Sequence, residues 1–250
     1  PKHRKAIFLC CDRNFEKFAA FLICQITARH PQADFDICLC SEDAITLPAS
    51  LDHLPVRLCQ INMPDTIQQA PGSDRINAAS YLRLFLPTAF ASEYDRILYL
   101  DADIWLTGGD LSRLLDVDLL EHHPIAAVRT SHQRNKMRRH MPEFKRLRLP
   151  PAPYFNAGVL LIDVPRWEET ETLSRALAVI TDHPEALDMH DQSVLNLVFR
   201  GRWSELSVAW NWMYSGRFSY MIEACDPFLI HFAGRIKPWN TLTGEFPPKY

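Results

Sequence analysis

Residues 6–40 follow the order buried strand, amphipathic helix, buried strand. Ala6 to Cys11 are apolar without interruption, which is typical of a strand covered on both faces. Apolar residues then recur at helical spacing at positions 15, 18, 19, 22, 23 and 26, and Pro31 follows the end of that pattern. Asp36 to Cys40 read as the next strand. This order predicts an α/β fold with a parallel sheet, and it places the residues after the first strand at the carboxyl edge of that sheet.

The rest of the chain continues the same alternation. Further strands are expected at Arg96–Leu100, Ile125–Arg129, Gly158–Asp163 and Phe228–His231, and further helices at Ala78–Leu86, Trp167–Thr181 and Ser193–Phe199. No linker, repeat or low-complexity segment interrupts the 250 residues. We therefore expect one domain over residues 1–250, a length that can bury a substantial core.

Charge and hydropathy exclude several classes of partner. The net charge of −3 gives no basic field, so a nucleic acid is not expected as a partner. No apolar run approaches the roughly 20 residues that span a bilayer. The basic residues 2–5 lead straight into a short strand pattern, unlike a signal peptide. The seven cysteines form no Cys-x-x-Cys pair and several lie in apolar runs, which favours a reducing, cytoplasmic location.

Glycine is scarce, with eight residues and no Gly-x-Gly. Both the dinucleotide-binding fingerprint and the phosphate-binding P-loop need glycines that let the backbone approach a phosphate closely. Any phosphate chemistry in this chain therefore requires a metal ion and side chains.

Asp101 and Asp103 directly follow the expected strand at 96–100. Residues i and i+2 of an extended chain share a face, so two carboxylates meet there. Such a pair suits a divalent cation that also coordinates diphosphate oxygens. The alternative is an ordinary loop or a helix cap.

His231 ends the last expected strand, and Gly234 and Lys237 follow it. The histidine is either a metal ligand or a satisfied core residue. Lys237 precedes Pro238, which favours an extended backbone and makes the ammonium group a well-held point charge for a phosphate.

Two further motifs carry amides and a carboxylate at element boundaries. Asn156 and Gly158 precede a buried strand, where Asn156 would bind a sugar hydroxyl or hold the turn by its own hydrogen bond. Asp191 and Gln192 open a helix and are either donor-site residues or first-turn caps.

The segment Arg129–Arg148 carries eight basic residues and a single acidic residue, Glu143. It is either a solvated surface or an arm that closes over the site and meets an anionic acceptor or lipid surface.

Taken together and in this order, these motifs resemble glycosyltransferase family 8, which includes glycogenin and bacterial lipopolysaccharide galactosyl- and glucosyltransferases. The matching segments span nearly the whole chain: residues 11–15 (CDRNF), 79–87 (ASYLRLFLP), 98–103 (LYLDAD), 154–162 (YFNAGVLLI), 190–196 (HDQSVLN) and 231–239 (HFAGRIKPW).

The resemblance implies a GT-A fold that uses a UDP-hexose and Mn²⁺, or Mg²⁺ in its place, with retention of the anomeric configuration. It implies metal ligands at Asp101, Asp103 and His231. The implied nucleotide contacts are Asp12, Asn14, Asp101, Ala102, Asp103, Gly234 and Lys237. The implied sugar contacts are Arg83, Asn156, Ala157, Gly158, Asp191 and Gln192. Asp191 would orient sugar hydroxyls, and the Gln192 amide oxygen would stabilise an oxocarbenium-like centre during same-face attack.

The expected reaction moves galactose or glucose to a saccharide or lipid-linked saccharide in bacterial lipopolysaccharide or surface glycan synthesis. The enzyme would be cytoplasmic, with peripheral contact to the anionic inner face of the membrane. A sugar-phosphate nucleotidyltransferase is one alternative, but it requires a Gly-rich basic loop where residues 12–15 stand. A catalytically silent sugar-nucleotide-binding protein on the same fold is another. A metal nuclease is disfavoured by the acidic net charge.

Overall fold

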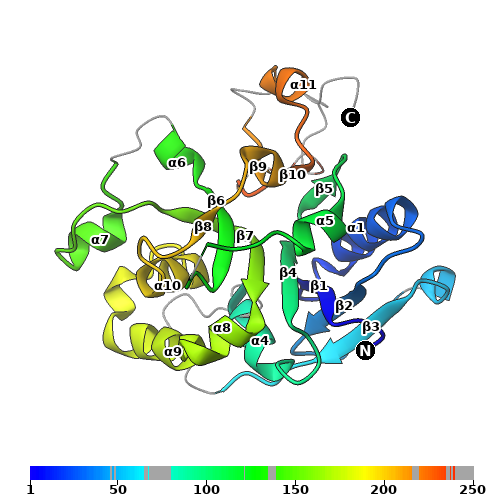
Figure 1. Cartoon of the computed structure of the whole chain (residues 1–250), viewed down its shortest axis with the longest axis horizontal. Coiled ribbons are helices and arrows are strands. Elements are labelled where there is room, and N and C mark those ends of the chain that lie inside the picture. The colour runs from blue at the N-terminus through cyan, green and yellow to red at the C-terminus, as the bar shows by residue number, and fades with distance from the viewer. Residues whose placement is uncertain are drawn as a thin grey trace.

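The computed structural model describes residues 1–45, 47, 49–64, 67, 80–120, 122–134, 139–215, 220–234, 237 and 239. Seven strands form the central sheet in the order β3-β2-β1-β4-β7-β6-β8 (Figure 1). Their bounds are β1 Lys5–Cys10, β2 Asp36–Ser41, β3 Val56–Gln60, β4 Arg96–Asp101, β6 Ile125–Arg129, β7 Phe155–Asp163 and β8 Ser204–Glu205. The strand pairs from β3 to β4, and the pair β6–β8, are parallel, and only β7 runs antiparallel to its neighbours.

Helices cover both faces of this sheet. Side chains of α1 (Glu16–Arg29) and α5 (Leu111–Leu115) form one core with one face. Side chains of α4 (Leu86–Ala89), α8 (Val164–Glu169), α9 (Thr172–Asp182) and α10 (Asp191–Val198) form a second core with the other. The other helices of the described residues are α6 Ser131–Arg134, α7 Pro142–Arg146 and α11 Met221–Cys225, with 3₁₀ turns at Ala49–Leu51, Leu82–Leu84, Pro184–Ala186 and Val208–Trp210.

The reversed direction of β7 determines where the site forms. Because β7 is antiparallel to β4, with Leu100 opposite Val159, its first residues lie at the edge where β4 ends. Parallel β1 ends at the same edge, with Cys10 opposite Asp101. The loops after β1 and β4 and the start of β7 therefore converge.

A smaller sheet, in the order β5-β10-β9, lies beside that edge (Figure 1). Its strands are β5 Ile104–Leu106, β9 Trp212–Met213 and β10 Leu229–His231. β10 is antiparallel to β5, and His231 lies opposite Ile104, the residue after Asp103. This pairing brings a histidine from the end of the chain to the Asp-x-Asp segment.

Most expected strands are confirmed, with β1, β2, β4, β6 and β10 within one residue of their predicted ends, while β7 begins three residues early. The helix expected at 167–181 is wrong as a single element. It divides into α8 and α9 because Glu171 adopts a left-handed conformation (φ 50°) and the Thr170 hydroxyl bonds the Arg166 carbonyl.

The helix expected at Ala78–Leu86 falls partly outside the described residues, at 78 and 79. Of the remainder, Ser80 and Tyr81 are helical as expected, residues 82–84 form a 3₁₀ turn, and α4 begins at Leu86. No helix of the described residues combines the length and hydropathy that a membrane span requires. All seven cysteines are free.

Candidate metal and nucleotide-sugar site

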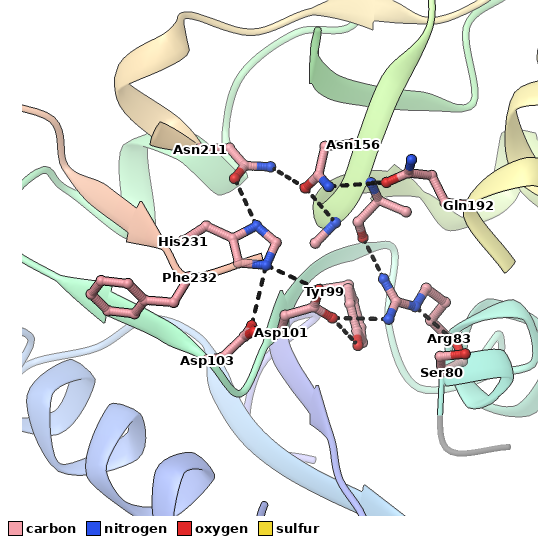
Figure 2. A network of polar contacts seen from close by, with 12 residues as sticks. Ser80, Arg83, Tyr99, Asp101, Asp103, Asn156, Gln192, Asn211, His231 and Phe232 are labelled. Atoms are coloured by element: carbon pink, nitrogen blue, oxygen red, sulfur yellow. Dashed lines mark hydrogen bonds and ion pairs between the residues drawn. The ribbon is translucent and has the colours of Figure 1, made fainter. Parts of the chain in front are cut away.

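Asp101, Asp103 and His231 meet at the carboxyl edge of the central sheet (Figure 2). The His231 Nε2 atom lies 3.4 Å from Asp101 Oδ2 and 3.2 Å from Asp103 Oδ1. One ligand atom from each of the three residues lies within 4.8 Å of the other two. Two carboxylates and an imidazole form a donor set that suits a divalent transition ion.

Gly158 provides the space that this cluster occupies. A β-carbon at position 158 would lie 2.2 Å from His231 Cε1 and 2.6 Å from Asp101 Oδ2. The start of β7 can therefore approach His231 and Asp101 only because residue 158 is glycine. The donor set and this close fit are consistent with a metal site.

The three groups strongly perturb one another's ionisation. Burial alone would favour neutral Asp101, but the guanidinium of Arg83 and the imidazole of His231 hold its pKa well below the ordinary value. The pKa of Asp103 is lowered in the same way by His231 and Lys237 against burial. Burial disfavours protonated His231, but Asp103 and Asp101 outweigh burial and raise its pKa to about 9.

Two basic side chains flank the cluster. Lys237 donates to Asp103 and to the carbonyl of Phe232, so its ammonium lies directly beside the expected metal ligands. Arg83, only 6% exposed, lies 2.9 Å from Asp101 Oδ1 through Nη2 and 3.0 Å from Asp191 Oδ2 through Nε. Arg83 thus bridges the metal-side carboxylate and the carboxylate expected at the sugar.

The sugar-side residues form a connected set. Asp191 is 5% exposed, and burial raises its pKa against the opposing effect of Arg83. The Gln192 Oε1 atom accepts from Asn156 Nδ2 at 2.9 Å and from the backbone N–H of Ala157 at 3.1 Å. The expected role of this oxygen at the sugar therefore requires one of these hydrogen bonds to open.

Four of the expected nucleotide residues, Asp12, Asp101, Ala102 and Asp103, line a pocket that includes the two carboxylates of the cluster. Asp12 Oδ1 accepts from the backbone N–H groups of Asn14 and Phe15, at 2.9 and 3.1 Å, and so turns the chain after β1 into α1. Asn14 and Gly234 are exposed. The pocket is lined by Cys10, Cys11, Asp12, Phe15, Ser80, Arg83, Tyr99, Asp101, Ala102 and Asp103.

Sequence reasoning missed two polar residues of the site. The Tyr99 hydroxyl donates to Asp101 Oδ1 at 2.7 Å, and the Tyr99 ring lies 4.4 Å from the Arg83 guanidinium. Asn211 is fully buried and bonds both His231 and Asn156. Each residue has a feature in the sequence that could have drawn attention to it. Tyr99 carries a hydroxyl within an apolar strand, and Asn211 lies between Trp210 and Trp212.

The basic segment is only partly a free surface. Arg129 pairs with Glu205 at 2.9 Å and Arg146 with Asp188 at 2.8 Å, whereas Arg139, Lys145 and Arg148 are exposed. Residues 135–138, and with them Lys136 and Arg138, lie outside the described residues, as does the side chain of Arg134.

The fold matches that of known glycosyltransferases. The structure of the galactosyltransferase LgtC, in complex with donor and acceptor sugar analogs, superposes with a TM-score of 0.75 and 21% identity. The superposition covers 94% of this chain and 89% of LgtC. The protein therefore has the GT-A fold.

The sequence defines the family. Residues 6–243 match Glycosyl transferase family 8, and the chain belongs to this family. It is 31% identical to the glycosyltransferase GlyF of Streptococcus pneumoniae serotype 4, over 66% of this chain and 39% of GlyF. It is 28% identical to the lipopolysaccharide 1,2-glucosyltransferase of Escherichia coli K12, over 77% of this chain and 58% of that enzyme. The chain thus spans less than two thirds of either relative.

Proposed function

We propose that residues 1–250 act as one retaining glycosyltransferase domain that moves glucose or galactose from a UDP-sugar to a saccharide or lipid-linked saccharide acceptor. The single observation that carries this proposal is the convergence of Asp101, Asp103 and His231 beside Lys237 and the Arg83–Asp191 pair. The name of the Escherichia coli relative, a lipopolysaccharide 1,2-glucosyltransferase, supports a bacterial lipopolysaccharide as the product.

Asp101, Asp103 and His231 would hold Mn²⁺, which accepts a mixed oxygen and nitrogen donor set more readily than Mg²⁺ does. The bound ion would supply positive charge to the diphosphate. Lys237 would add a charge-assisted hydrogen bond to the same group, and Gly234 would allow the loop to approach it. Asp12, Asn14 and Ala102 would border the uridine.

Arg83, Asp191, Gln192 and the Asn156–Gly158 segment would surround the hexose. A double displacement would need a free carboxylate on the sugar face opposite the leaving UDP. Asp101 and Asp103 are committed to the metal, and Asp191 lies against Arg83, which lowers its nucleophilicity. We therefore propose same-face attack, with Asp191 orienting sugar hydroxyls and a diphosphate oxygen taking the acceptor proton.

The experiment that tests this function is a thermal-shift panel of nucleotide sugars, with and without Mn²⁺, followed by a transfer assay. UDP-glucose or UDP-galactose should stabilise the protein only when Mn²⁺ is present, and Asp103→Asn should abolish both that effect and transfer. Asp110→Asn is the matched control, because Asp110 caps α5 away from the site. Transfer by Asp103→Asn at the wild-type rate would refute the assignment. UDP-sugar binding without turnover would favour the silent binding protein.

A further inference from the structure

Asn211 occupies a position between the metal side and the sugar side of the site (Figure 2). It precedes β9 and none of its surface is exposed. Its Oδ1 atom lies 3.0 Å from His231 Nδ1, and its Nδ2 atom lies 2.8 Å from Asn156 Oδ1. Asn156 in turn contacts Gln192, so three amides connect the imidazole to the sugar-side residues.

Backbone N–H groups fix the direction of every hydrogen bond in this chain of amides. The Gly158 N–H, 3.1 Å away, can only donate, so the atom of Asn156 that faces it must be the oxygen. The Ala157 N–H fixes the Gln192 oxygen by the same argument. Asn156 therefore donates through Nδ2 to Gln192, and Asn211 must present its own Nδ2 to the Asn156 oxygen.

The remaining atom of the Asn211 amide, Oδ1, is left facing His231. An oxygen can only accept, so the proton of the neutral imidazole is placed on Nδ1, and Nε2 is left with a free lone pair. Nε2 is the atom that faces Asp101 and Asp103. The backbone of β7 thus selects, through two side-chain amides, the tautomer of His231 that can bind a metal.

We infer that Asn211 is a positioning residue with two separable duties. Its oxygen orients His231 as a metal ligand, and its amide nitrogen holds Asn156 and, through Asn156, Gln192. Histidine ligands usually need such a partner on the second ring nitrogen, and losing one typically weakens metal binding about 10- to 100-fold. The inference rests on the proposed metal-dependent function.

Two substitutions separate the duties. Asn211→Ala removes both the acceptor for His231 and the donor to Asn156. Asn211→Asp keeps an oxygen for the His231 Nδ1–H but offers Asn156 no donor. Gln133→Ala is the matched control, because Gln133 is another fully buried amide that makes three hydrogen bonds to backbone groups of residues 139, 152 and 154.

The primary measurement is the affinity for Mn²⁺ alone, determined by electron paramagnetic resonance of the free ion at one fixed pH. We expect Asn211→Ala to bind Mn²⁺ about 10- to 100-fold more weakly than the wild type, and Asn211→Asp to remain within about threefold of it. Both Asn211 variants should lower kcat for UDP-sugar transfer, because both release Asn156. Gln133→Ala should lower the melting temperature without changing Mn²⁺ affinity.

The outcomes distinguish this inference from the proposed function. If the wild type did not bind Mn²⁺, both the proposed metal dependence and the inference would be overturned. If the wild type and Asn211→Ala bound Mn²⁺ equally well, only the inference would be overturned. Equal losses of Mn²⁺ affinity in the Ala and Asp variants, matched by equal falls in melting temperature, would reduce Asn211 to a structural residue and would also overturn it.

Discussion

The substitution Gly158→Ala tests how closely the start of β7 fits the expected metal ligands. The added β-carbon would lie 2.2 Å from His231 Cε1, and the tightest ordinary contacts of this kind begin near 3.4 Å, so the imidazole must retreat by about 1.2 Å. Asp101 Oδ2, at 2.6 Å, must move by about 0.8 Å on the same basis. Gly158 does not have a positive φ, so the whole effect is steric.

Such shifts exceed what a metal site tolerates, since ligand distances hold to about 0.2 Å. We expect Gly158→Ala to weaken Mn²⁺ binding by at least about 100-fold, which corresponds to roughly 2.7 kcal/mol. Overpacking of a buried site should also lower the free energy of unfolding by about 1–3 kcal/mol. Isothermal titration with Mn²⁺ and UDP, together with denaturant unfolding, would measure the two effects.

Gly108→Ala is the matched control for this experiment. Its β-carbon would meet only Phe228 Cδ1 at 3.5 Å, an ordinary contact, and it too lacks a positive φ. We expect wild-type Mn²⁺ affinity and little change in stability. If Gly158→Ala bound Mn²⁺ as tightly as Gly108→Ala, the steric reasoning would be refuted, and the three side chains would not be the metal ligands.

The other expected outcomes concern the site residues and, in one case, the basic segment Arg129–Arg148. Lys237→Ala should weaken UDP by roughly ten- to hundred-fold but leave uridine almost unaffected, because a charge-assisted contact is worth about 1.5–3 kcal/mol; equal losses would point to misfolding. Arg138→Glu with Arg139→Glu should leave UDP affinity unchanged and reduce transfer to an anionic acceptor; unchanged transfer would leave the segment as a solvated surface. The raised pKa of His231, about 9 against an ordinary value near 6.5, stabilises the metal-free fold fully below about pH 6.5, and this contribution is lost as the pH rises through about 9. Mn²⁺ needs the neutral imidazole, so its affinity should rise over that interval, with proton release detectable by titration in two buffers. NMR of the product should show retention of the anomeric configuration, and mass spectrometry of enzyme quenched with donor alone should find no sugar on Asp191.

Five strands of the central sheet, β1, β2, β4, β6 and β7, could be predicted because each is a largely apolar run long enough to cross a buried layer. The edge strand β3 was not expected, because Arg57 and Gln60 interrupt its apolar residues. β5, β8 and β9 could not be predicted either, since strands of two or three residues carry no period. These short strands form because they pair with segments far along the chain. For example, Ile230 of β10 lies opposite Trp105 of β5 and Trp212 of β9. The sequence therefore indicated that His231 ends a strand, but the neighbour that brings it to Asp103 came only from the fold.

The polar residues of the site also divide into those that the sequence could predict and those that it could not. Asp101 and Asp103 could be predicted because both lie on one short segment after a strong strand. The bridging role of Arg83 could not, because its ion pairs reach Asp101 and Asp191, which lie 18 and 108 positions further along the chain. The role of Asn211 could not be predicted for the same reason, since its partners His231 and Asn156 lie 20 and 55 positions away.

The alternatives that the sequence left open for Asn156 prove compatible with each other. Its oxygen accepts from the Gly158 N–H two residues on, which is the local turn bond expected of an asparagine in a loop. Its nitrogen simultaneously donates to Gln192, so the same side chain also belongs to the site. An amide can do both because its oxygen and nitrogen bond independently.

Asn156→Asp should therefore keep the turn, because a carboxylate also accepts from Gly158. It should nevertheless release Gln192, so transfer should fall while the melting temperature stays near that of the wild type. If the melting temperature fell markedly together with transfer, Asn156 would act mainly by holding the turn, and not by its link to Gln192.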